Sequence, residues 1–138
     1  MKSIRMLIVE DDKDLLARLK HLYREAFANQ GFGSVTIEQA ETVIEARDLA
    51  RQAQPNPYDL VSLDVNLGDA DSTGLDVLAS LKRFRSAWMV ALLTGVETDK
   101  SLDKTMGADK AGKIRRHLRR DAYARFPAER LMVVEKPS

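Results

Sequence analysis

Acidic side chains stand at the ends of two apolar runs in this sequence. Glu10 and Asp11 follow the run MLIV (6–9) in the segment LIVEDD, and Asp64 lies at the end of the apolar segment YDLVSLDV. Neighbouring carboxylates repel one another, and burial makes their ionisation harder still. Such a cluster is costly unless it faces water or meets a cation. Carboxylate oxygens are the ligands that suit a hard octahedral cation such as Mg²⁺.

A hydroxyl and an amine follow two later apolar runs in the same way. Thr94 ends the run WMVALLT, and Lys136 follows RLMVVE. The hydroxyl offers one hydrogen-bond donor, and the lysine offers a mobile positive charge. Together with carboxylates and a metal, these groups can hold the oxygens of a phosphoryl group during its transfer. The set therefore indicates that Asp64 is a carboxylate that accepts phosphate.

The hydrophobic pattern predicts elements that could bring these residues together. Short apolar runs predict buried strands, and a weaker alternation predicts an edge strand; the ranges are 6–9, 58–65, 88–95 and 130–137 for the buried strands and 35–37 for the edge strand. Apolar residues at helical spacing predict helices over 14–29, 41–54 and about 75–84, with Thr73 as N-cap of the last. Alternating strands and helices indicate a parallel sheet covered by helices on both faces. In such sheets function gathers at the carboxyl ends of the strands, which is where the candidate residues stand.

Size and composition narrow the class of protein. The chain has 138 residues, the size of one domain, and its net charge of +1 gives no general attraction to nucleic acid or acidic membranes. It contains no cysteine, which excludes disulfides, thiol catalysis and cysteine zinc sites. No stretch has the ~20 apolar residues of a membrane span, and the run at 6–9 is too short for a signal peptide. We expect a soluble, cytoplasmic domain without membrane contact.

Four segments, in order, resemble the receiver domains of two-component response regulators. They are LIVEDD, YDLVSLDVNLG, ALLTG and VVEKP, each at the end of a predicted strand. The resemblance covers nearly the whole chain, so we expect one receiver domain over 1–138. It implies a flavodoxin-like α/β fold, in which a doubly wound five-stranded parallel sheet has strand order 2-1-3-4-5.

The resemblance also implies roles in phosphotransfer. Asp64 would be the phosphoacceptor, Thr94 the switch hydroxyl, and Lys136 the lysine that pairs with the phosphoryl group. The donor would be a sensor histidine kinase or a phosphotransfer protein. The chain would not be an enzyme beyond Mg²⁺-dependent self-phosphorylation and slow self-dephosphorylation. An output domain beyond the C-terminus would carry the response, and a homodimer stays open.

A metal site is implied at the same place. Asp11 would bind Mg²⁺ directly, Glu10 would act through water, and Asp64 together with the backbone carbonyl of Asn66 would complete the protein ligands. The Lys136–Pro137 peptide bond would be cis, as in the family.

The sequence departs from the family's pattern before the last strand. The 42 positions from Thr94 to Lys136 are more than the family usually has. Lys113 lies nearer the customary distance and is a rival, but we prefer Lys136 because it follows an apolar strand. The insertion, about 97–129, is predicted to hold an extra helix at about 109–124. Its basic run, 110–120, is interpreted as the solvent-exposed face of that helix, so nucleic-acid binding is not expected. The alternative is a docking surface for an acidic partner or nucleic acid.

Two further departures concern the switch and the end of the fold. Val133 stands where the family often has an aromatic residue, which puts the usual coupling of hydroxyl and ring in question. The chain ends soon after Lys136, so the family's last helix is expected to lie outside it, or the fold is closed by something else.

Two other functions stay open. These departures favour a receiver-like interaction module that is not phosphorylated, whereas the acids, Thr94 and Lys136 argue against it. A Mg²⁺-dependent phosphohydrolase with an aspartyl nucleophile would use similar chemistry. However, the segment DVNL (64–67) lacks the second acid that haloacid dehalogenase-like phosphatases carry two places on.

Overall fold

The computed structural model describes residues 2–65, 74–94 and 120–135. Strands and helices alternate along these ranges, in the order β1 (Lys2–Val9), α1 (Lys13–Asn29), β2 (Phe32–Ala40), α2 (Val43–Gln52), β3 (Tyr58–Asp64), α3 (Gly74–Arg83), β4 (Ala87–Thr94), the 3-10 turn η1 (Ala128–Arg130) and β5 (Leu131–Glu135). Residues 120–125 are helical as well. In these ranges no helix has the length and apolar character needed to cross a bilayer.

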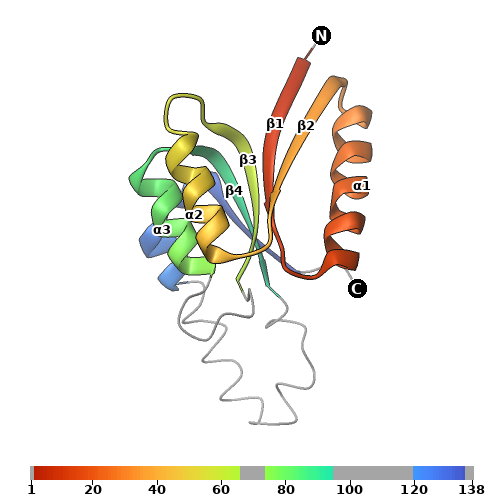
Figure 1. The fold of residues 1–138 in the computed structure, drawn as a ribbon. Coiled ribbons are helices and arrows are strands. Elements are labelled where there is room, and N and C mark those ends of the chain that lie inside the picture. Colours follow the sequence, from red (N-terminus) through yellow and green to blue (C-terminus); the bar gives the residue numbers. More distant parts are fainter. Residues whose placement is uncertain (1, 66–73, 95–119, 136–138) are drawn as a thin grey trace.

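The strands form one parallel sheet with the order β2-β1-β3-β4-β5. Helix α1 covers one face, and α2 and α3 cover the other (Figure 1). Both faces are therefore buried, which explains why the central strands are continuous apolar runs. The predicted doubly wound fold and its strand order are confirmed.

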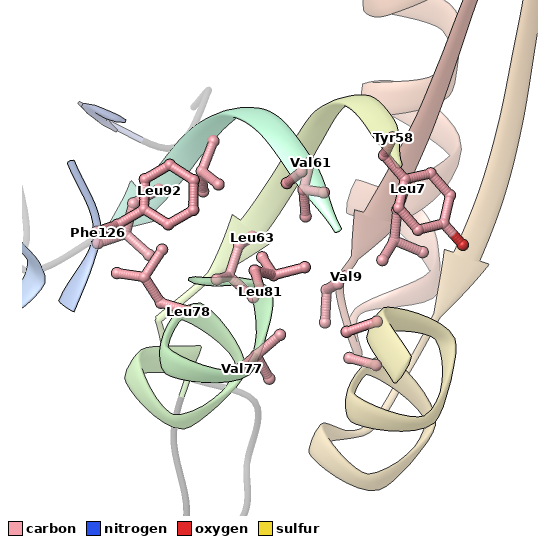
Figure 2. Packing of buried hydrophobic residues seen from close by; sticks show 14 of the residues in the cluster. Leu7, Val9, Tyr58, Val61, Leu63, Val77, Leu78, Leu81, Leu92 and Phe126 are labelled. Atoms are coloured by element: carbon pink, nitrogen blue, oxygen red, sulfur yellow. The ribbon is translucent and has the colours of Figure 1, made fainter. Parts of the chain in front are cut away.

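The larger core lies between the sheet and helices α2 and α3, and Figure 2 shows part of it. Alternate side chains of the central strands point to this side, where they meet small residues of α2 and branched residues of α3. Its members include Leu7, Val9, Val61, Leu63, Leu92, Ala46, Ala50, Val77, Leu78, Leu81 and Phe126. Burial of each large aliphatic side chain stabilises the fold by about 1.5–3 kcal/mol.

A second core lies between the sheet and α1. The remaining side chains of the central strands, such as Met6 and Ile8, point to this face. They pack against Leu15, Leu16 and Leu19, which lie on one side of α1. The four residues of MLIV therefore divide between two cores, two on each face.

Most predicted elements are confirmed, although several boundaries differ. β1 and β2 are longer than predicted, because they pair along eight residues of β1 and extend into exposed, polar positions. β2 is an edge strand, as predicted. The predicted helix 41–54 begins at Val43, because the Thr42 hydroxyl caps it by accepting a hydrogen bond from the Glu45 N–H at 3.1 Å.

Parts of the predicted insertion lie outside the described residues. The helical segment 120–125 overlaps the end of the predicted helix 109–124, and Ala122 is buried in the larger core. The earlier part of that helix, the basic run 110–120 up to residue 119, and the rival Lys113 fall in the undescribed range. Thr73 and the Lys136–Pro137 peptide bond also fall outside the described residues.

Candidate functional site

The three consecutive acids after β1 occupy three different environments. Glu10 is completely buried, and its Oε2 accepts a hydrogen bond from the Asp12 N–H at 3.2 Å. Asp12 caps α1, because its Oδ1 accepts from the N–H groups of Asp14 and Leu15 at 3.0 and 3.1 Å. Asp11, between them, is exposed. Capping accounts for Asp12, so Glu10 and Asp11 are the two acids that remain as candidates for metal binding or catalysis.

Asp64 is held at the end of β3 by neighbours on both sides. Its backbone is paired with Leu93 of β4, and the next N–H, that of Val65, donates to the Leu93 carbonyl at 3.1 Å. On the other side β3 pairs with β1, so the ends of β1 and β3 meet at one edge of the sheet. The side chain of Asp64 is only 1% exposed.

A glycine allows α3 to begin against the end of β3. The Gly74 N–H donates to the Val65 carbonyl at 2.8 Å. A Cβ at Gly74 would collide with the Asp64 carbonyl oxygen and would lie 2.9 Å from the carbonyl carbon of Asp64. Both atoms belong to the backbone, which has little room to move aside. Gly74 therefore fixes how closely the helix approaches the residue that carries the candidate carboxylate.

The carboxylates of Glu10, Asp11 and Asp64 converge at this edge. One oxygen from each lies within 4.8 Å of the others. Burial raises the pKa of Glu10 from its ordinary value of 4.5 to about 8, and the negative charge of Asp64 acts in the same direction. The hydrogen bond from the Asp12 N–H acts the other way but is the weaker influence. The cluster therefore favours anything that neutralises its charge.

The arrangement fits a hard divalent cation. Its donors are carboxylate oxygens from the ends of two adjacent strands, and two of the three carboxylates are buried. Oxygen donors of this kind suit Mg²⁺, and a cation among them would offset the repulsion that now raises the pKa of Glu10. The prediction that these three acids come together is thus supported by the geometry.

Thr94 ends β4 at the same edge and is buried, with 1% of its surface exposed. It directly follows Leu93, the pairing partner of Asp64. On its other side it pairs with Glu135 of β5, the residue before Lys136 in the sequence. Lys136 itself and Asn66 lie outside the described residues.

Val133, at the position of the family's aromatic switch, faces the larger core. It pairs with Leu92 and packs, partly buried, against the cluster that contains Phe126. Phe126 is buried, whereas Tyr123 and Trp88 are exposed. Trp88 stands at the start of β4, at the end of the strand away from Thr94.

Sequence reasoning missed two structural residues of the site and one buried hydrogen bond. An aspartate directly before a helical pattern is an N-cap signal, and that signal could have identified Asp12. No local pattern marks Gly74, because its role depends on a contact with β3. The bond from the Tyr23 hydroxyl to the buried Ser62 Oγ, at 2.9 Å, also joins residues that are distant in sequence.

Comparison with known proteins decides the family. A family described as "Response regulator receiver domain" matches residues 6–122, which is most of the chain. The chain belongs to this family. The predicted resemblance is confirmed, and with it the assignment to two-component signalling. The match ends before β5, although β5 completes the receiver sheet.

Two curated proteins are similar to this chain in sequence, and one solved structure is similar to it in fold. The chain is 34% identical to the photosynthetic apparatus regulatory protein RegA of Cereibacter sphaeroides over 90 residues. Those residues are 65% of this chain and 42% of RegA. It is 37% identical over 90 residues to RegA of Rhodovulum sulfidophilum, which is 65% of this chain and 43% of that protein. The receiver domain of the Francisella response regulator 1452 has the same fold, with a TM-score of 0.51 at 22% identity over 79% of this chain and 78% of that one. The chain thus spans less than half the length of the curated relatives it matches.

Proposed function

We propose that this receiver domain accepts a phosphoryl group on Asp64 from a phosphohistidine of a sensor histidine kinase or a phosphotransfer protein. The observation that carries the proposal is the convergence of Glu10, Asp11 and Asp64 within 4.8 Å at the carboxyl edge of the sheet. Buried like charges are costly, so their retention at a strand end favours a site that meets a cation and a phosphoryl group.

The transfer itself needs little from the protein beyond position and charge. A carboxylate oxygen of Asp64 attacks the phosphorus in line as the N–P bond of the donor histidine breaks. The histidine nitrogen keeps the electron pair of that bond, and the new O–P bond forms an acyl phosphate on Asp64. The pairing of Asp64 with Leu93 and the contact with Gly74 hold the attacking group at the edge.

Mg²⁺ would be held by Asp11, Asp64 and the backbone carbonyl of Asn66, with Glu10 acting through water. When bound, it would neutralise negative charge on the carboxylates and on the phosphoryl oxygens. Glu10 contributes a fixed position, because its Oε2 is held by the Asp12 N–H and Asp12 in turn is held at the start of α1.

Thr94 and Lys136 would bind the phosphoryl oxygens once they are on Asp64. The Thr94 hydroxyl donates one hydrogen bond, and Lys136 supplies one positive charge. The pairing of Glu135 with Thr94 supports Lys136 over Lys113, because it brings the chain just before Lys136 alongside Thr94. These new bonds would bias two conformations of the region between β4 and β5, which controls the output.

The wider setting follows from this chemistry. A histidine kinase takes its phosphoryl group from ATP, so we infer that the domain works in the cytoplasm. We infer that 1–138 forms one receiver unit, and that the output lies in a further domain of a longer chain or in a homodimer. Self-phosphorylation and slow loss of the phosphoryl group would be its only catalysis.

The test is intact mass after incubation with Mg²⁺ and acetyl phosphate. The parent should gain one phosphoryl group, and Asp64→Asn should gain none while keeping its fold. Asp48→Asn, at an exposed aspartate on α2, is the matched control and should behave as the parent does. Chelation of Mg²⁺ by EDTA should abolish uptake by the parent.

Two outcomes would count against the proposal. Equal uptake by Asp64→Asn would show that the acceptor is another residue. A folded parent that binds Mg²⁺, as seen in a raised melting temperature, but takes up no phosphoryl group would favour the interaction module that is not phosphorylated.

A further inference from the structure

A cavity of about 670 Å³ opens at the other edge of the sheet, where the strands begin. Its walls come from the end of α3, the start of β4 and the segment before β5. Trp88 lies at this end of β4 and Thr94 at the other end. Their separation of six residues corresponds to roughly 20 Å along a strand. The cavity is therefore remote from the carboxylate cluster.

Four cationic side chains line the cavity, namely Lys82, Arg83, Arg85 and Arg130. None of its described lining residues is acidic. Within the described ranges the ion pairs involve other residues, so none of these four cations is neutralised by a carboxylate of this part of the chain. The whole chain has a net charge of +1, so this is a local concentration of positive charge.

An aromatic wall orders one of these cations. The Arg130 guanidinium lies 5.0 Å from the centre of the Trp88 ring and 5.8 Å from that of Phe126. Phe126 is anchored in the larger core, whereas Trp88 is 64% exposed. These cation–π contacts hold the guanidinium beside the two rings, and its N–H groups remain able to bind a carboxylate in the fork geometry that arginine favours. A tryptophan and an arginine beside each other are the residue types that dominate binding energy at protein interfaces.

We propose that this cavity binds an acidic peptide segment of a partner protein, with an apolar side chain against Trp88 and carboxylates beside the four cations. The partner would be held at the edge opposite Asp64. The phosphotransfer edge would stay accessible while this partner is bound, so the proposal does not depend on phosphorylation.

The arrangement favours spaced carboxylates over a phosphate or a nucleic acid. Lys82 and Arg83 lie in the last turn of α3, so the helix presents its carbonyl end near the cavity, which disfavours a compact phosphate. Three of the cations come from the end of α3 and the turn after it, and Arg130 comes from η1, so two separate segments supply the positive charge. Single-stranded nucleic acid stacks successive bases on several aromatic rings, and here Trp88 is the exposed ring among the described lining residues.

The test begins with selection of a phage-displayed library of random dodecapeptides on the full chain. Enriched peptides should carry Asp or Glu on both sides of Leu, Phe or Trp. One enriched peptide that lacks tryptophan, made synthetically, should change the fluorescence of Trp88, which is the sole tryptophan of the chain. Oligothymidylate and inorganic phosphate should give no such change at matched ionic strength.

Variants then locate the binding. Lys82→Glu should weaken the peptide about fivefold, as loss of one exposed attraction and gain of one repulsion imply. Arg130→Ala should weaken it by a similar factor or more. Lys2→Glu is the matched control, because it makes the same change in net charge at an exposed lysine that lies over Phe32 of β2. It should leave the affinity unchanged, and circular dichroism should show that all three variants fold.

The proposal fails if no acidic, apolar motif is enriched. It also fails if the folded Lys82→Glu and Arg130→Ala variants bind the enriched peptide as tightly as the parent does. Binding of oligothymidylate that Arg130→Ala abolishes, without peptide binding, would instead assign the cavity to nucleic acid.

Discussion

The two edges of the sheet carry charge of opposite sign at different depths. At the carboxyl edge, Glu10 and Asp64 are buried, and burial together with the negative charge of Asp64 raises the pKa of Glu10. At the amino edge, Lys82, Arg83 and Arg85 are exposed cations around an open cavity. Buried like charges destabilise a fold, whereas exposed charges cost little because water screens them.

This difference in burial determines how strongly the charged residues of each edge indicate a function. A destabilising cluster such as that of Glu10 and Asp64 indicates a function by its existence alone, because packing would be better served by apolar residues. At the cationic edge, no single residue is informative. There the inference rests on the combination of unneutralised charge, a cavity and the cation–π pair of Arg130 and Trp88.

The largest expected difference between the two edges is the loss of stability when a glycine is replaced by alanine. Gly74→Ala would place a Cβ against the Asp64 carbonyl, and we expect it to lower the free energy of unfolding by about 3 kcal/mol. Gly31, at the C-terminal end of α1, has a φ of +89°, but a Cβ there would meet nothing within 4 Å. Gly31→Ala should therefore cost about 1 kcal/mol, from backbone strain alone. Urea unfolding measures both; equal costs would mean that the contact at Gly74 relaxes easily.

Charge removal at the carboxyl edge should stabilise the metal-free protein. The pKa of Glu10 is about 8 when folded, against an ordinary value of 4.5, so between these pH values the folded state keeps a proton that the unfolded chain has lost. Its contribution to stability is therefore fully present below about pH 4.5 and is lost as the pH rises through about 8. The rise from 4.5 to about 8 corresponds to at most about 5 kcal/mol. Because Glu10→Gln still buries a polar amide, which offsets part of that gain, we expect it to raise the free energy of unfolding by about 2 kcal/mol at pH 9 and little at pH 4.5.

Urea unfolding with EDTA present, at both pH values, measures the effect of Glu10→Gln. A variant less stable than the parent at pH 9 would show that the buried carboxylate is compensated by other contacts. Glu45→Gln is the matched control, because Glu45 is an exposed glutamate on α2; it should show no gain on going to pH 9.

Substitutions of the adjacent acids after β1 should also differ from one another in their effects on stability and on Mg²⁺ binding. Asp12→Ala removes the cap of α1, and we expect a loss of about 1 kcal/mol in the free energy of unfolding with Mg²⁺ binding largely kept. Asp11→Ala should do the reverse, with little change in stability and loss of the Mg²⁺-dependent rise in melting temperature. The two variants make the same change in charge at adjacent positions. If both lost Mg²⁺ binding equally, the division between cap and ligand would be wrong.

The contrast between Asp11 and Asp12 also shows how far the sequence predicts the site. Strand ends can be located from apolar runs, and parallel strands bring their carboxyl ends to one edge, so the meeting of Glu10, Asp11 and Asp64 was predictable. The same periodicity predicted a parallel sheet covered by helices, whereas the strand order was implied by the family resemblance alone. Periodicity does not tell which of the adjacent acids Glu10, Asp11 and Asp12 caps the helix and which belong to the cluster, since all three carry the same charge.

Contacts between distant segments were not predictable. Gly74 matters because it approaches the backbone of Asp64, and no feature of the sequence around Gly74 records that approach. The cavity of the amino edge is hidden for the same reason. Lys82 and Arg130 are far apart in sequence, and they line one cavity only because β4 and β5 lie side by side.

Exposed charge at the amino edge should have the smallest effect on stability. Lys82→Glu reverses a charge in the last turn of α3, where a cation favours the helix carbonyl end, and we expect a change within about 0.5 kcal/mol in urea unfolding. The same variant should weaken the acidic peptide about fivefold. A large loss of stability would mean that the cations of this edge support the fold itself. A small loss of stability, compared with the gain expected for Glu10→Gln, would show that the buried acids of this sheet destabilise the fold whereas its exposed cations barely affect stability.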